Sequence, residues 1–138
     1  MKTIIAAGLV LLSASAGLAD EAPVAEGTLH ANLAGPSHVA KQDGEGIYNS
    51  VCAACHMPNA KGGTGAGHYP ALAANDKLAA SAYPVTLVMN GSKGMPSFKG
   101  MMSDAQIAAV VTYVRTHFGN GYADPVTLEE VKQVRETQ

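Results

Sequence analysis

Cys52-Ala53-Ala54-Cys55-His56 is the stretch that decides the fold of this chain, whose 138 residues contain no other cysteine. Two thiols three residues apart on a helix-like turn can add to the two vinyl groups of a haem, and the histidine that follows is then carried onto an axial position of the iron. The motif therefore predicts one covalently attached haem c, with Cys52 and Cys55 as the attachment points and His56 as the first iron ligand.

Three other interpretations of the two cysteines compete with haem attachment. A thioredoxin-type redox pair would need a strand before the motif and a βαβ pattern around it, and neither is predicted. A structural disulfide is disfavoured by the tight two-residue loop and by the histidine beside it. A structural zinc site would need further ligands, and the other histidines of the chain are His30, His38, His68 and His117. Haem attachment is the leading hypothesis.

The second axial ligand has to come from another part of the chain. Haem electron carriers commonly pair histidine with methionine, whose soft thioether raises the reduction potential. Met95 lies between Gly94 and Pro96, which favour an extended backbone that can present a side chain across a haem. Met57 adjoins His56 and cannot reach the opposite haem face, and Met89 is expected in the core. The remaining alternatives are His68, His117, Met101 and Met102.

Hydrophobic periodicity predicts an all-α fold. The first helix should run from about Asp43 into Cys52, and a short helix should begin near Pro84 and stop at Gly91. The clearest helix spans 104–118. Its apolar stripe comprises Ile107, Val110, Val111, Val114 and Phe118. No strand is predicted.

Two capping boxes mark the starts of the last two predicted helices. Ser103 and Gln106 form the first box, at the start of the helix 104–118. Thr127 and Glu130 form the second, which opens a short helix to about residue 136. The charged residues of this last helix indicate an amphipathic cover rather than a core element.

Composition divides the chain into four parts. Residues 1–19 are typical of a signal peptide, with a cut after Ala19 and an alternative cut after Ala16. Residues 20–40 are rich in Ala, Gly and Pro and are expected to form a flexible arm. Residues 41–119 should form the haem domain, and 120–138 a C-terminal tail with a short helix. The mature protein is therefore expected in the periplasm, without a stable membrane span after signal cleavage.

The charge pattern excludes some classes of function. Removal of residues 1–19 takes away only one basic residue and leaves eight basic and eleven acidic ones. No run of basic residues suggests a nucleic-acid partner. No Ser/His/Asp or paired-carboxylate pattern suggests catalysis, so the chain is not expected to be an enzyme.

The residues from Lys41 to Phe118 resemble the class I cytochromes c. The matching positions in chain order are Gly44, Tyr48, Cys52, Cys55, His56, Pro70-Ala71-Leu72, Met95-Pro96, Val110 and Tyr113. The resemblance implies that the N- and C-terminal helices cross around one covalent haem. Gly44 would allow a close approach to Val110 and Tyr113.

The same resemblance assigns residues around the haem. It implies His56 and Met95 as the iron ligands. It also implies that the Pro70 carbonyl accepts a hydrogen bond from the free ring nitrogen of His56, which would fix the orientation of the histidine. Tyr69, Pro70 and Leu72 are implied as cofactor-binding residues.

Two stretches, 69–75 and 119–127, are similar more narrowly to the cytochrome subunits that serve periplasmic dehydrogenases. This chain departs from them at Met57, where many members have glycine, and by its single haem motif. The resemblance implies a periplasmic electron-transfer protein that accepts electrons from a dehydrogenase and passes them to a downstream cytochrome or oxidase of the respiratory chain. The alternatives are a haem protein with a labile distal ligand, acting as a sensor or like a peroxidase, and a zinc-binding interaction module.

Overall fold

The computed structural model describes residues 39–65 and 67–137, so the expected signal peptide, 1–19, and almost all of the expected arm, 20–40, lie outside the described residues. The helices are α1 (Gly44–Ile47), α2 (Ala53–His56), α3 (Ala82–Asn90), α4 (Asp104–Thr116) and α5 (Leu128–Glu136). A π-helical turn (η1, Tyr48–Cys52) joins α1 to α2, and a 3₁₀ turn (η2, Asp76–Leu78) precedes α3. The prediction of a helical fold is confirmed.

A small antiparallel strand pair adds an element that the sequence did not predict. Strands β1 (Gly63–Thr64) and β2 (His68–Tyr69) pair with Gly63 opposite Tyr69. Gly62 precedes this hairpin with φ +65°, and a Cβ there would lie 2.7 Å from the carbonyl carbon of Pro70. Glycine is therefore required where the two arms of the hairpin approach each other.

The first helical segment is longer than predicted. It begins after Asp43, whose carboxylate accepts a hydrogen bond from the Gly46 amide at 2.6 Å, and it continues through the π turn to His56. A π turn inserts one residue into the helix, and such insertions are frequent at functional sites. The expected end at Cys52 is thus the end of the π turn, and one more helical turn carries the remainder of the Cys-Ala-Ala-Cys-His motif.

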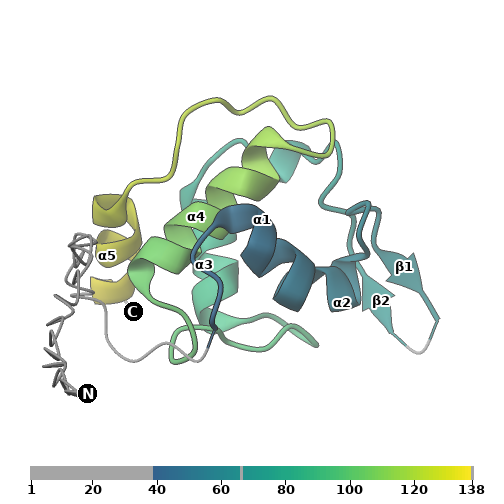
Figure 1. The fold of residues 1–138 in the computed structure, drawn as a ribbon, viewed down its shortest axis with the longest axis horizontal. Coiled ribbons are helices and arrows are strands. Elements are labelled where there is room, and N and C mark those ends of the chain that lie inside the picture. The colour runs from purple at the N-terminus through teal and green to yellow at the C-terminus, as the bar shows by residue number, and fades with distance from the viewer. Residues whose placement is uncertain (1–38, 66, 138) are drawn as a thin grey trace, which may run out of the picture. The chain divides into compact units, whose positions relative to one another are not determined.

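Helix α1 packs against α4 at the centre of the fold (Figure 1). Gly44 permits this contact, because a Cβ there would lie 2.7 Å from the Cβ of Tyr113 and would also collide with the carbonyl oxygen of Ala109. Close approach to Tyr113 was implied by the family resemblance, whereas the other neighbour of Gly44 on α4 is Ala109, which supplies the atom nearest to the added Cβ, rather than Val110. Ile47 and Tyr48 are fully buried beside this contact.

Both predicted capping boxes are present. The Ser103 hydroxyl accepts from the Gln106 amide, and the Gln106 side chain accepts from the Ser103 amide at 2.9 Å. The Thr127 box has the same two contacts with Glu130. Helix α4 ends at Thr116 rather than at the predicted 118.

Helix α5 lies against α3 and α4 (Figure 1). Its apolar face contributes Val131, which is fully buried, and its Arg135 pairs with Asp104 at 2.6 Å. Met89 belongs to the core, as predicted. No helix among residues 39–65 and 67–137 combines the length and the apolar character that a membrane crossing requires.

Candidate functional site

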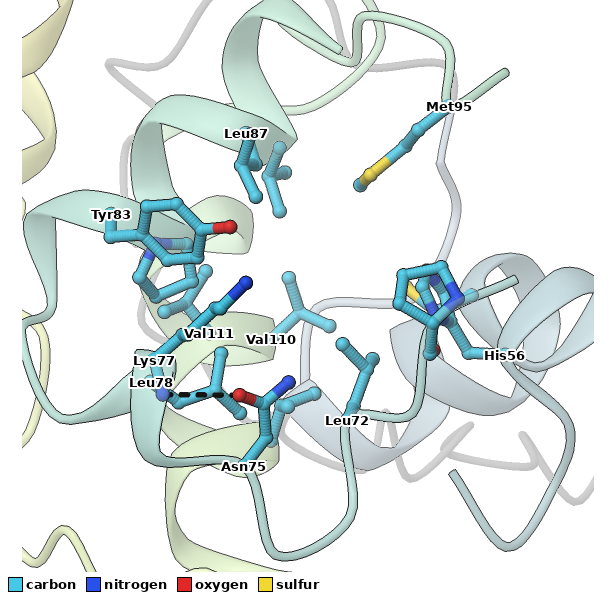
Figure 2. A pocket seen from close by; sticks show the side chains of 15 residues that line it. His56, Leu72, Asn75, Lys77, Leu78, Tyr83, Leu87, Met95, Val110 and Val111 are labelled. Carbon is cyan, nitrogen blue, oxygen red and sulfur yellow. Dashed lines mark hydrogen bonds between the residues drawn. The ribbon is translucent and has the colours of Figure 1, made fainter. Parts of the chain in front are cut away.

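A largely apolar cavity lies between the motif helix, α3 and α4, with about 870 Å³ of empty space when its open mouth is included (Figure 2). Its lining comprises Cys52, His56, Pro70, Leu72, Asn75, Lys77, Leu78, Tyr83, Pro84, Leu87, Val88, Met95, Val110, Val111 and Val114. A concave, mostly apolar lining of this kind suits an organic group.

His56 ends α2 and is buried at the edge of this cavity, with 8% of its surface exposed. Its Nδ1 lies 3.0 Å from the carbonyl oxygen of Pro70. A carbonyl oxygen can only accept a hydrogen bond, so Nδ1 is the donor, and in the neutral imidazole Nε2 then keeps its lone pair. The contact that the resemblance implied is present, and it prepares His56 to bind a metal through Nε2.

Met95 directs its sulfur into the cavity from a different segment of the chain, as Figure 2 shows. Its amide donates to the carbonyl oxygen of Ser92 at 2.9 Å, and its carbonyl oxygen accepts from the Ser92 amide at 3.0 Å. Gly91 has φ +73°, and a Cβ there would lie 2.8 Å from the carbonyl carbon of Pro96. The short loop is thus fixed on both sides of the methionine.

The end of α3 holds the same loop from the other side. The Ser97 hydroxyl donates to the carbonyl oxygen of Met89 at 2.5 Å, and the Phe98 amide donates to that of Val88 at 3.0 Å. The loop therefore satisfies carbonyl groups that the helix end would leave unpaired. A thioether held this firmly can serve as a metal ligand with little rearrangement.

Cys52 lines the cavity, and Cys55 is half-buried one helical turn later. Burial raises the pKa of the Cys52 thiol to about 11, and the charge of Cys55 adds to the rise.

The remaining predicted site residues differ in whether they line the cavity. Leu72 lines the cavity beside Pro70. Tyr69 lies on β2 and is not among the lining residues; its ring covers Gly67, where a Cβ would lie 3.1 Å from the phenol oxygen. The two alternative histidine ligands are both exposed outside the lining: His68 is on β2, and His117 stacks on Tyr113 with ring centroids 4.1 Å apart.

The sequence did not identify several residues that line the cavity. Val110, Val111 and Val114 were interpreted as ordinary core residues of the helical stripe, and they also face this space. Tyr83 and Leu87 are one helical turn apart on α3, a spacing that could have marked a shared face. Figure 2 shows the amine of Lys77 and the hydroxyl of Tyr83 directed toward the cavity; no sequence signal distinguished that lysine.

Comparison with known proteins identifies the family. A family model described as cytochrome c oxidase, cbb3-type, subunit III matches residues 39–114. This chain belongs to the class I c-type cytochromes. Such a cytochrome carries haem c covalently, and Cys52 and Cys55 have the spacing that this attachment uses.

Three relatives illustrate the range of this cytochrome family. The chain is 32% identical to cytochrome c-552 of Thermus thermophilus, over 75% of the chain and 81% of the relative. It is 43% identical to cytochrome c6 of Leptolyngbya boryana, over 49% of the chain and 81% of the relative. It is 35% identical to the fructose dehydrogenase cytochrome subunit of Gluconobacter japonicus, over 67% of the chain but only 22% of that longer relative.

The residues of the cavity fit the haem of a c-type cytochrome. The lining is apolar along α3 and α4, as a large macrocycle requires. A histidine with a free Nε2 and a methionine sulfur reach the space from separate segments. At least one of the two thiols borders the same space.

Proposed function

We propose that this cytochrome is a periplasmic electron carrier in which Cys52 and Cys55 bind one haem c and His56 and Met95 are the axial iron ligands. The observation that carries the proposal is the pair of ligands at one cavity: a buried imidazole oriented through Nδ1 and a thioether on a fixed loop. Haem c supplies an iron that alternates between Fe(III) and Fe(II).

The residues of the chain have to keep the site the same in both oxidation states. The bond from His56 to Pro70 holds the imidazole in one tautomer and one orientation. The two backbone hydrogen bonds between Ser92 and Met95 fix the loop from which the thioether extends. The valines of α4 give the cavity an apolar wall. Such a site needs little rearrangement when it gains or loses an electron, which favours transfer over catalysis.

We further infer the partners from two kinds of support. One relative is named as the cytochrome subunit of fructose dehydrogenase, and the stretch 119–127 is similar to the tails of such subunits. A periplasmic dehydrogenase is therefore the proposed electron donor, and a downstream cytochrome or oxidase of the respiratory chain the proposed acceptor. A periplasmic donor requires that this chain be exported, and export depends on the expected signal peptide at 1–19.

Replacement of Met95 tests the ligand assignment. Met95→Ala should remove the weak thioether-to-iron absorption band of the oxidised protein and lower the reduction potential, because the thioether stabilises the reduced iron. Met101→Ala is the matched control, since Met101 is half-buried outside the cavity lining. An unchanged band and potential in Met95→Ala would contradict the assignment.

Carbon monoxide distinguishes the electron carrier from a sensor or a peroxidase-like protein. A cavity with both axial positions closed should bind carbon monoxide hardly at all after reduction. A labile distal ligand would allow rapid and complete binding. Rapid binding by the unmodified protein would favour the alternative function.

A further inference from the structure

One wall of the cavity is a segment with little regular structure of its own. Residues 72–79 contain only the single 3₁₀ turn η2, yet Leu72, Asn75, Lys77 and Leu78 from this segment line the cavity. A wall without a helix or strand needs other partners for its backbone groups. Those partners come from the end of α4 and the chain that follows it.

Asn120 binds the first half of this wall. It is buried, with 8% of its surface exposed, and its Oδ1 accepts from the Asn75 amide at 2.9 Å. Its Nδ2 donates to the carbonyl oxygen of Leu72 at 2.8 Å and to that of Val114 on α4 at 2.8 Å. One side chain thus ties two backbone positions of the wall to the helix behind it.

Arg115 binds the second half of the wall. It lies on α4 and is fully buried, which is rare for arginine unless its donors are paired. Nε donates to the carbonyl oxygen of Leu78 at 2.9 Å, and Nη2 donates to that of Ala79 at 3.0 Å. Its only ionic partner among the described residues is Asp124, at 2.9 Å, whose side chain is 73% exposed.

Backbone strain lies where the wall meets the segment after α4. Ala74 has φ +46° and Phe118 has φ +58°, and the Ala74 amide donates to the carbonyl oxygen of Phe118 at 3.1 Å. Residues other than glycine keep such angles only where the surrounding contacts impose them. The wall and the segment 117–124 are therefore fitted to each other.

We propose that Arg115 and Asn120 are positioning residues that hold the wall 72–79 closed over the cavity. This inference rests on the proposed function, because the closed wall is proposed to keep water and small ligands away from the haem site of an electron carrier. It assigns the segment 117–124 to the cofactor site itself, in addition to any contact that the tail makes with a partner.

Substitution at the two positions tests the proposal in the full-length haem protein. Asn120→Ala removes three hydrogen bonds and should leave the fold intact, while Arg115→Met removes both the charge and the donors. Arg115→Lys keeps the charge but cannot reproduce the fork of donors. Thr127→Ala is the control, because it weakens α5 at its cap, by about 1 kcal/mol, without touching residues 72–79.

Two measurements are compared across these variants. Hydrogen–deuterium exchange reports the opening of the wall at residues 72–79, and carbon monoxide binding to the reduced protein reports access to the cavity. Asn120→Ala should exchange about tenfold faster or more at the Asn75 amide. It should also bind carbon monoxide faster than Thr127→Ala does. Both Arg115 variants should show the same two changes.

Three outcomes would overturn the proposal. The first is exchange at the wall in Asn120→Ala that matches Thr127→Ala. The second is faster exchange without faster carbon monoxide binding, which would uncouple the wall from the cavity. The third is an Arg115→Lys variant that behaves like the unsubstituted protein, which would assign the effect to charge alone. The proposed function fails separately, through Met95→Ala, which changes none of the wall contacts.

Discussion

Gly44→Ala tests the contact that sets the positions of α1 and α4. The added Cβ would lie 2.7 Å from the Cβ of Tyr113 and 2.9 Å from the carbonyl carbon of Ala109. Carbon atoms pack at about 3.5 to 4.0 Å, so the two helices would have to separate by roughly 1 Å. Overpacking of this kind costs about 1 to 3 kcal/mol, offset by at most about 1 kcal/mol from placing alanine in a helix.

The net loss of about 1 to 2 kcal/mol corresponds to a fall in Tm of roughly 5 to 15 °C for a domain of this size. Urea and thermal unfolding of the haem protein measure it. Gly46→Ala is the matched control on the same helix, because the nearest atoms to its added Cβ belong to the side chain of Asp43, at the start of α1, and not to α4. A Gly44→Ala variant at least as stable as Gly46→Ala would refute the close packing of α1 on α4.

Three further predictions concern the surroundings of the site. Burial raises the pKa of Tyr48 to about 12. The unfolded state loses this proton first, so stability should fall as the pH rises from about 10 to 12. Denaturant unfolding across this pH range measures the fall, which should be smaller in Tyr48→Phe. Met57→Gly should be more stable than Met57→Ala by roughly 1 kcal/mol, because Met57 has φ +67° and glycine adopts such an angle without strain. Denaturant unfolding of the two variants measures the difference. The opposite order of stability would show that glycine relieves no strain at this position. Gly62→Ala should lose about 1 to 3 kcal/mol in the same assay, because its Cβ would collide with the backbone of Tyr69 and Pro70, and a neutral result would contradict that packing.

Local chemistry made part of this structure predictable from the sequence. The capping boxes at Ser103 and Thr127 fix helix starts through contacts three residues apart, and both are present. The motif histidine and its neighbours also depend on short-range geometry. The departure at Met57, noted from the sequence, has a structural counterpart, since its backbone has the positive φ that glycine adopts without strain.

The parts that were not predicted depend on contacts between distant segments. Arg115 follows the apolar stripe of α4 as a charged residue, and nothing local indicates that it is fully buried. Its burial is possible because carbonyl groups 36 and 37 residues away accept its hydrogen bonds. Asn120 likewise finds its partners at Leu72 and Asn75. The role of the segment after α4 in the cavity wall was therefore invisible to pattern and propensity.

The most direct test of the central claim is mass spectrometry of the protein isolated from its native compartment after proteolysis. The account predicts one peptide containing residues 52–56 that carries a single haem through thioether bonds to both Cys52 and Cys55. The same peptide recovered with two free thiols, a disulfide or no haem would contradict it.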